Sequence, residues 1–140
     1  MHRYITIDDI REEIQDRTPD DNVIDCDLSF SDDEIVHAME RAAAAYNSVP
    51  PLGVDVVSGK RLPLHNDIFM YATLSKLYNS ATFKLARNMA SWQTGETTVD
   101  LKKSRMDAYK ALVKEFDDMW KPAAAARKAE LNRAQCWGNW

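Results

Sequence analysis

The sequence predicts a mainly α protein, a small helical bundle with a protruding loop or hairpin and an extended C-terminal arm. Hydrophobic residues make up 45% of the 140 residues and charged residues 29%, which is the normal range for a globular domain. Four Gly and five Pro are too few for the many turns of an all-β sandwich or barrel. Two long segments repeat apolar residues at helical spacing, and the length fits one core. We therefore expect a helical domain in residues 1–121 and an arm in residues 122–140.

The N-terminal third contains two sequence signatures of a helix start. Thr6 is a capping residue with Asp9 three positions later, and Ser31 stands in the same relation to Glu34. Apolar residues flank each cap at the positions of a hydrophobic staple. The second helix should end before the two prolines at positions 50 and 51. Its predicted buried face consists of Ile35, Ala38, Met39, Ala42 and Tyr46.

Residues 51–63 interrupt the helical pattern. A run of β-favouring residues meets Ser58-Gly59, a plausible hairpin turn, and continues into the basic pair Lys60 and Arg61. An isolated two-stranded hairpin is only marginally stable in water, so an ordered hairpin here needs support from outside the domain. We expect a protruding loop or small hairpin, with Lys60 and Arg61 as interface residues.

Two long helices are predicted at residues 64–90 and 99–121, with antiparallel packing because the connection between them is short. The first has an apolar face made of Ile68, Tyr71, Leu74, Tyr78, Ala81, Leu85 and Met89, widened by Phe69, Leu77 and Phe83. The second has two apolar stripes, Leu101, Ala108, Leu112 and Met119, and Met106, Tyr109, Val113, Phe116 and Trp120. So wide an apolar face should pack against more than one neighbour. Pro122 should kink or end this helix.

The last nineteen residues, 122–140, are Ala-rich and polar, yet they close on two tryptophans. Tryptophan buries a large apolar area when it finds a pocket, and it is enriched among residues that dominate interfaces. The expected interface residues of the arm are Arg127, Lys128, Leu131, Arg133, Trp137 and Trp140. Docking onto another subunit explains such a tail better than the alternative, in which the tryptophans cap the chain's own helices.

Charge is unevenly distributed along the chain, whose formal net charge is −4. Residues 1–34 hold twelve acidic side chains and three arginines, whereas residues 121–140 hold four basic side chains and one glutamate. Identical copies could therefore attract one another end to end. The acidic body makes free duplex DNA a poor main partner, because duplex binding requires a basic face that neutralises phosphates.

The sequence contains no recognisable catalytic or metal-binding motif. Cys26 and Cys136 are far apart and lack the spacing of a metal site or a disulfide framework, so both should be reduced thiols. The acidic clusters at 8–9 and 32–34 fit the first turns of helices better than a Ca²⁺ or carboxylate site. We expect no catalytic, cofactor-binding or metal-binding residues, no cofactor and no enzyme activity. No apolar segment has the length of a membrane span, so we expect synthesis and retention in a cytosol.

The order of these elements resembles the head-to-tail adaptor, or connector, proteins of tailed bacteriophages. The resemblance covers roughly residues 5–120 and is one of pattern, without a diagnostic motif. It is carried by a short capped helix, an acidic loop, a helix containing Glu34-Ile35, Ala38-Met39 and Ala42, a protruding loop, and a long helix opened by Pro63 with Leu77-Tyr78 inside it. It departs from such proteins in the insertion at residues 51–63 and in the Trp-ended arm.

The resemblance implies a non-enzymatic structural virion protein in the neck, made in the host cytoplasm. Such proteins form a homo-oligomeric ring, commonly of twelve copies, beneath the portal after DNA packaging. The arm and the exposed loop would then engage the portal protein and tail or tail-tube proteins, with no membrane and at most incidental contact with packaged DNA. Two alternatives remain open: a tail-completion or other neck protein, and a small cytosolic helical regulatory or antitoxin-like binding module acting as a dimer.

Overall fold

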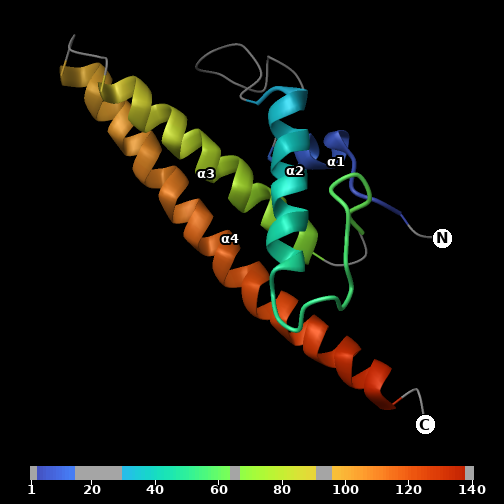
Figure 1. Cartoon of the computed structure of the whole chain (residues 1–140). Helices are drawn as coiled ribbons and strands as arrows, with labels where there is room; N and C mark the ends of the chain where they lie inside the picture. Colours follow the sequence, from blue (N-terminus) through green and yellow to red (C-terminus); the bar gives the residue numbers. More distant parts are fainter. Residues whose placement is uncertain (1–2, 15–29, 64–66, 91–95, 138–140) are drawn as a thin grey trace.

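The structure is a computed structural model that describes residues 3–14, 30–63, 67–90 and 96–137, with side chains except at 88–90, 96–103 and 137 (Figure 1). Its helices are α1 (Ile7–Glu13), α2 (Asp32–Asn47), α3 (Ile68–Ala90) and α4 (Glu96–Trp137). Within these ranges there is no strand, only an isolated antiparallel bridge between Tyr4 and Pro63. The predicted mainly α class is confirmed.

Both predicted helix starts are present. The Thr6 hydroxyl accepts a hydrogen bond from the Asp9 backbone N–H at 3.2 Å, and the Asp9 carboxylate accepts one from the Thr6 N–H at 2.9 Å. The Ser31 hydroxyl accepts from the Glu34 N–H at 3.2 Å, which caps α2. Such bonds satisfy backbone donors that a helix leaves unpaired at its N-terminus. All five residues of the predicted buried face of α2 are buried.

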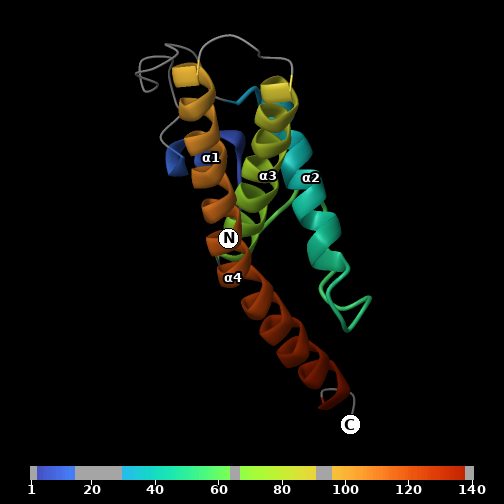
Figure 2. The ribbon, with the colours of Figure 1, turned by 90° about the vertical axis from the view of Figure 1, so that its left-hand side faces the viewer.

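The two long helices pack antiparallel, as predicted. Tyr71 of α3 stacks on Phe116 of α4 with ring centroids 5.9 Å apart. Tyr78 follows Tyr71 by seven residues in α3, and Tyr109 precedes Phe116 by seven residues in α4. The ring centroids of Tyr78 and Tyr109 are 5.2 Å apart. The two helices therefore run in opposite directions (Figures 1 and 2).

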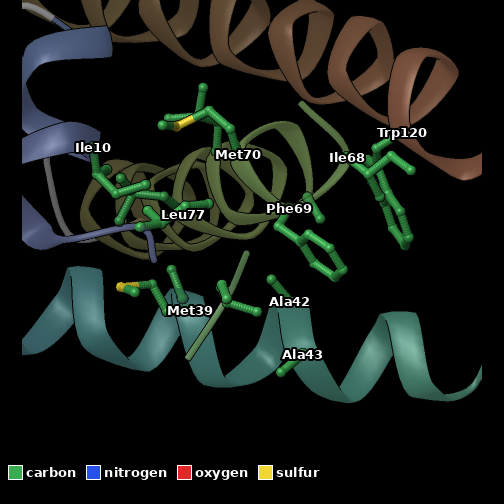
Figure 3. Close-up of a cluster of buried hydrophobic side chains, with 14 of the residues drawn as sticks. Ile10, Met39, Ala42, Ala43, Ile68, Phe69, Met70, Leu77 and Trp120 are labelled. Carbon is green, nitrogen blue, oxygen red and sulfur yellow. The ribbon is translucent and has the colours of Figure 1, made fainter. Parts of the chain in front are cut away.

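A single hydrophobic cluster forms where α3 passes between α2 and α4 (Figure 3). Side chains from all four helices enter it, including Ile10 of α1, Met39 of α2, Phe69 and Leu77 of α3, and Trp120 of α4. Because α3 contributes to contacts on both sides, it is the most buried helix of the domain.

The outer apolar stripes are more exposed than the sequence predicts. Phe83 of α3 is 69% exposed, Met119 of α4 is 45% exposed, and Ala108 is also exposed. The reason is the arrangement of the helices: α3 covers one side of α4, and no second helix of the described chain covers the side that carries Ala108 and Met119. We expected so wide an apolar face to pack against more than one neighbour, and within the described chain no second helix covers Ala108 and Met119.

The predicted protruding loop or small hairpin is a loop without strands, and residues 50–63 follow α2 back toward α1 instead of protruding as a whole (Figure 1). The Asn47 side-chain amide donates to the Val57 carbonyl and accepts from the Val57 N–H, both at 2.9 Å. Gly59 packs directly on α2, where a Cβ atom would come within 2.6 Å of the Glu40 Cα. These contacts provide within the chain the support that we expected from a partner.

Pro122 does not end its helix, because α4 continues for a further fifteen residues to Trp137. Proline removes one backbone donor and crowds the carbonyl four residues earlier, so an interior proline needs compensation. Here the chain is held on both sides of it: Trp120 and Ala124 are 2% and 0% exposed. The expected boundary between residues 121 and 122 is therefore not a break in the helix.

Phe116→Ala should lower the free energy of unfolding by about 2–4 kcal/mol, because it removes a half-buried ring that stacks on both Tyr71 and Tyr78. Urea denaturation measures this value. Met119→Ala is the matched control, since that side chain lies on the exposed side of the same helix and should change stability by about 0.5 kcal/mol or less. Equal effects of the two substitutions would contradict the assignment of the buried face.

Candidate functional site

The part of α4 that extends past its helical partner is the most distinctive feature of the molecule. α4 has 42 residues and α3 has 23, so their lengths are about 63 Å and about 35 Å. Tyr71 of α3 already lies opposite Phe116, which leaves residues 121–137 beyond the start of α3. We call this segment distal α4. It passes the C-terminal end of α2 and the loop of residues 50–63 before its end extends from the body (Figures 1 and 2).

A carboxylate from the loop joins distal α4 to α2. The Tyr46 hydroxyl, at the end of α2, donates to Oδ2 of Asp55 at 2.6 Å. Arg127 of distal α4 donates from Nε to the same oxygen at 2.9 Å. Gly53 and Asp55 both have positive φ, 80° and 52°, and the loop turns sharply between them. One oxygen atom thus connects the end of α2, the loop that follows it, and distal α4, where Arg127 is 72 residues away from Asp55.

Lys128 makes the second connection. It is fully buried, and its Nζ donates to the Val49 carbonyl at 2.8 Å. The same ammonium lies 4.8 Å from the centroid of the Tyr46 ring, in a cation–π contact. The Tyr46 ring in turn packs edge-on against Phe69 of α3, with centroids 4.7 Å apart. Lys128 therefore links distal α4 to the hydrophobic core.

The pKa values of this cluster reflect burial and pairing. Burial raises the pKa of Tyr46 well above its usual value, and the hydrogen bond to Asp55 and the negative charge of that residue raise it further. Burial alone would raise the pKa of Asp55, but hydrogen bonds from Tyr46 and Arg127 outweigh it, so this pKa is lowered. Burial also lowers the pKa of Lys128, only partly offset by the charge of Asp55. Tyr46 is thus a neutral donor and Asp55 a charged acceptor at neutral pH.

The structure separates the residues that we predicted as an interface. Lys60 and Arg61 are exposed on the loop, as an interface requires. Arg127 and Lys128 face inward: Arg127 is paired with Asp55, and Lys128 has no exposed surface. For Lys128 the interface prediction is therefore corrected, because a partner cannot reach its side chain in this conformation.

The remaining predicted interface residues lie toward the end of α4. Leu131 is half-buried and Arg133 is exposed. Trp137 is the last residue of the helix, with its side chain outside the described part, and Trp140 lies outside the described residues. The structure therefore neither joins the two tryptophans to the cluster nor separates them from it.

Sequence reasoning missed Tyr46 and Asp55 as partners of the arm. A signal was available, because Ala124, Lys128 and Leu131 continue the spacing of Trp120 through Pro122 and thus define one helical face. Treating the proline as a helix end hid that continuity. The pairing of Asp55 with Arg127 spans 72 residues and has no local signal.

The cluster is suited to holding segments in place. Its donors and acceptors are satisfied by one another at 2.6–2.9 Å, and its charged groups are held by partners within the chain. In the described part of the chain, no three His, Cys, Asp or Glu side chains come together in a group that could hold a metal ion. We therefore treat this cluster as a positioning site for distal α4.

Comparison with known proteins returns no relative. No protein-family model, curated protein or solved structure matches the chain. Across the described ranges, no helix is both long enough and apolar enough to cross a membrane.

Lys128→Met should be tolerated better than Lys128→Ala. Methionine keeps the apolar stem against the Tyr46 ring and removes a buried charge, so we expect a loss of about 1 kcal/mol or less. Alanine also loses the packing, which should raise the cost to about 2–3 kcal/mol. Urea denaturation of the two variants measures the difference. If both lose the same stability, the bond to the Val49 carbonyl outweighs the packing.

Proposed function

We propose that the protein is a structural virion protein whose copies form an oligomeric ring that joins the portal of a phage head to the tail. The observation that carries the proposal is the attachment of distal α4. A helix of 42 residues runs past its own core, is fixed there by Asp55 and Val49, and ends in a turn whose residues 133–136 are all exposed. A helix end presented in this way is suited to contact a neighbouring subunit.

The loop supplies a second exposed surface near the same end of the molecule. Leu52 and Val56 are 72% and 67% exposed, although both are apolar. They belong to the same loop as Asp55, which is bound to Arg127 of distal α4. Apolar side chains exposed beside a projecting helix favour protein contact over free solvent. Together with the order of the helices, this supports a subunit of an assembly over a protein that acts alone.

The electrostatic part of the head-to-tail hypothesis is weaker in the structure than in the sequence. Of the four basic residues in residues 121–140, Arg127 is paired with Asp55 and Lys128 is buried. The ammonium of Lys121 lies 3.5 Å from a carboxylate oxygen of Asp117, and Arg133 is exposed near the end of α4. We therefore expect association to depend on apolar contacts, including the terminal tryptophans, and only weakly on salt.

The proposed partners are other copies of this chain, the portal protein and tail or tail-tube proteins, in the neck of the virion. A ring of about twelve copies is the expectation from the family resemblance. Contacts with packaged DNA would be incidental. A tail-completion or other neck protein would share the exposed arm but would not assemble on the portal, so the portal distinguishes these two functions.

Native mass spectrometry of the purified chain, alone and mixed with a portal, tests the proposal. We expect one closed stoichiometry that forms or becomes dominant when the portal is present. A chain that stays a dimer under both conditions would favour the cytosolic regulatory module. A chain that stays monomeric with the portal, but joins purified tails, would favour tail completion.

Deletion of residues 136–140 should abolish incorporation into the assembly while leaving the melting temperature nearly unchanged. The deletion removes both terminal tryptophans but no side chain of the described core. The control is Gln135→Ala, which alters a neighbouring exposed residue and should assemble normally. Should the truncated chain unfold or aggregate, the tryptophans belong to its own core and the proposal loses its main support.

A further inference from the structure

We propose that the loop of residues 50–63 and distal α4 open and close as one unit, with the Asp55 carboxylate as the bond they share. Engagement of the loop by any partner is then transmitted to the end of α4, and engagement of the end of α4 is transmitted to the loop. This inference goes beyond the proposed ring and does not require it, because it concerns two segments of a single chain.

Distal α4 has little apolar hold on the body. Among its described side chains only Ala124 and Lys128 are buried, an alanine and a lysine. The aromatic contacts that fix the first part of α4, such as Phe116 on Tyr71, are not continued in distal α4, where the hydrophobic cluster receives only the small side chains of Ala123 and Ala124. The attachment of distal α4 therefore depends largely on the polar bonds of Arg127 and Lys128.

Those bonds all end on one short stretch of chain. Arg127 reaches Asp55, and Lys128 reaches the Val49 carbonyl and the Tyr46 ring. Tyr46 lies at the end of α2, and the other two acceptors belong to the segment that follows it. A movement of this segment therefore acts on both attachments of distal α4 together.

The opening should be all-or-none. Asp55 accepts from Tyr46 and Arg127 through the same oxygen, so an outward turn of the loop breaks both bonds at once. The Tyr46 hydroxyl would then lose its acceptor while its residue is fully buried. Leaving a buried donor unpaired is costly, so partly opened conformations are disfavoured. Segments coupled in this way exchange as one cooperative unit.

The loop offers an accessible surface through which a partner can act. Leu52 and Val56 are largely exposed, while Asp55 between them faces inward. The far side of the loop is fixed to α2 by the two bonds between Asn47 and Val57. A contact on the exposed tip that draws Asp55 away from its donors therefore also loosens the bonds between Val57 and Asn47, while α2 itself stays helical.

Hydrogen exchange of the full-length chain, followed by mass spectrometry, tests the coupling in both directions. Asp55→Asn, in the loop, should accelerate amide exchange in residues 121–137 at least tenfold. Arg127→Gln, in α4, should accelerate exchange of the Val57 amide, which Asn47 protects, by a similar factor. In the double variant, amide exchange should be less than twofold faster than in the more strongly affected single variant, because both substitutions break the same bond.

Asp118→Asn is the matched control, since it makes the same chemical change at an exposed position of α4 and should alter neither segment. Exchange in α3 should stay at the wild-type rate in every variant. Acceleration confined to the mutated segment would overturn the proposal. If Arg127→Gln accelerated amide exchange in α3 as much as in the loop, the proposal would also be overturned. The substitution would then lower the stability of the whole fold and not that of the two segments.

Discussion

The length difference between α3 and α4 is the constraint on which the rest of the structure depends. An apolar face is stabilised only as far as a neighbouring helix covers it, and α3 covers α4 no further than about Trp120. Beyond that point the chain needs another means of fixing the helix. Two carboxylates fix α4 on either side of this point: Asp117 of α4 itself, which bonds to α3, and Asp55 of the loop, which bonds to Arg127.

Asp117 accepts hydrogen bonds from the Ser75 hydroxyl of α3 at 2.5 Å and from the Trp120 indole N–H at 2.9 Å. Burial would raise the pKa of Asp117, but these hydrogen bonds outweigh it and lower the pKa, as at Asp55.

This mode of attachment changes how the charge of the C-terminal segment is understood. In the sequence, Arg127 and Lys128 look like a basic surface for an acidic neighbour. In the structure their positive charges face the chain's own carboxylate, carbonyl and aromatic groups. A charge that is already paired contributes little to steering between molecules. The surface left for a partner combines the apolar side chains of Leu52 and Val56 on the loop with the exposed Lys60 and Arg61 and the exposed end of α4.

Sequence reasoning succeeded where the determining interactions are local. The caps at Thr6 and Ser31 depend on a residue three positions away, and both are present. The antiparallel pair also followed from sequence, because a short connection leaves two long amphipathic helices few alternatives. It failed where the answer depends on which neighbour is present. Phe83 has the right spacing for the core but is left exposed by the described part of the chain, and the partner of Arg127 is 72 residues away. For the candidate site, the sequence thus identified exposed loop residues but not the cluster that fixes the arm.

Pro122 shows why the attachment has to lie on both sides of it. An interior proline costs about 3 kcal/mol of helix stability, chiefly because the carbonyl four residues earlier loses its donor. That carbonyl belongs to Asp118, and both residues are exposed, so water can replace the missing bond. A bound water does not fix the direction of distal α4, the part of the helix that follows Pro122. The direction is set by Asp117 on one side of the proline and by Arg127 on the other, through bonds to α3 and to the loop. Distal α4 can therefore act as a positioned contact element only while the Asp55 bond is intact.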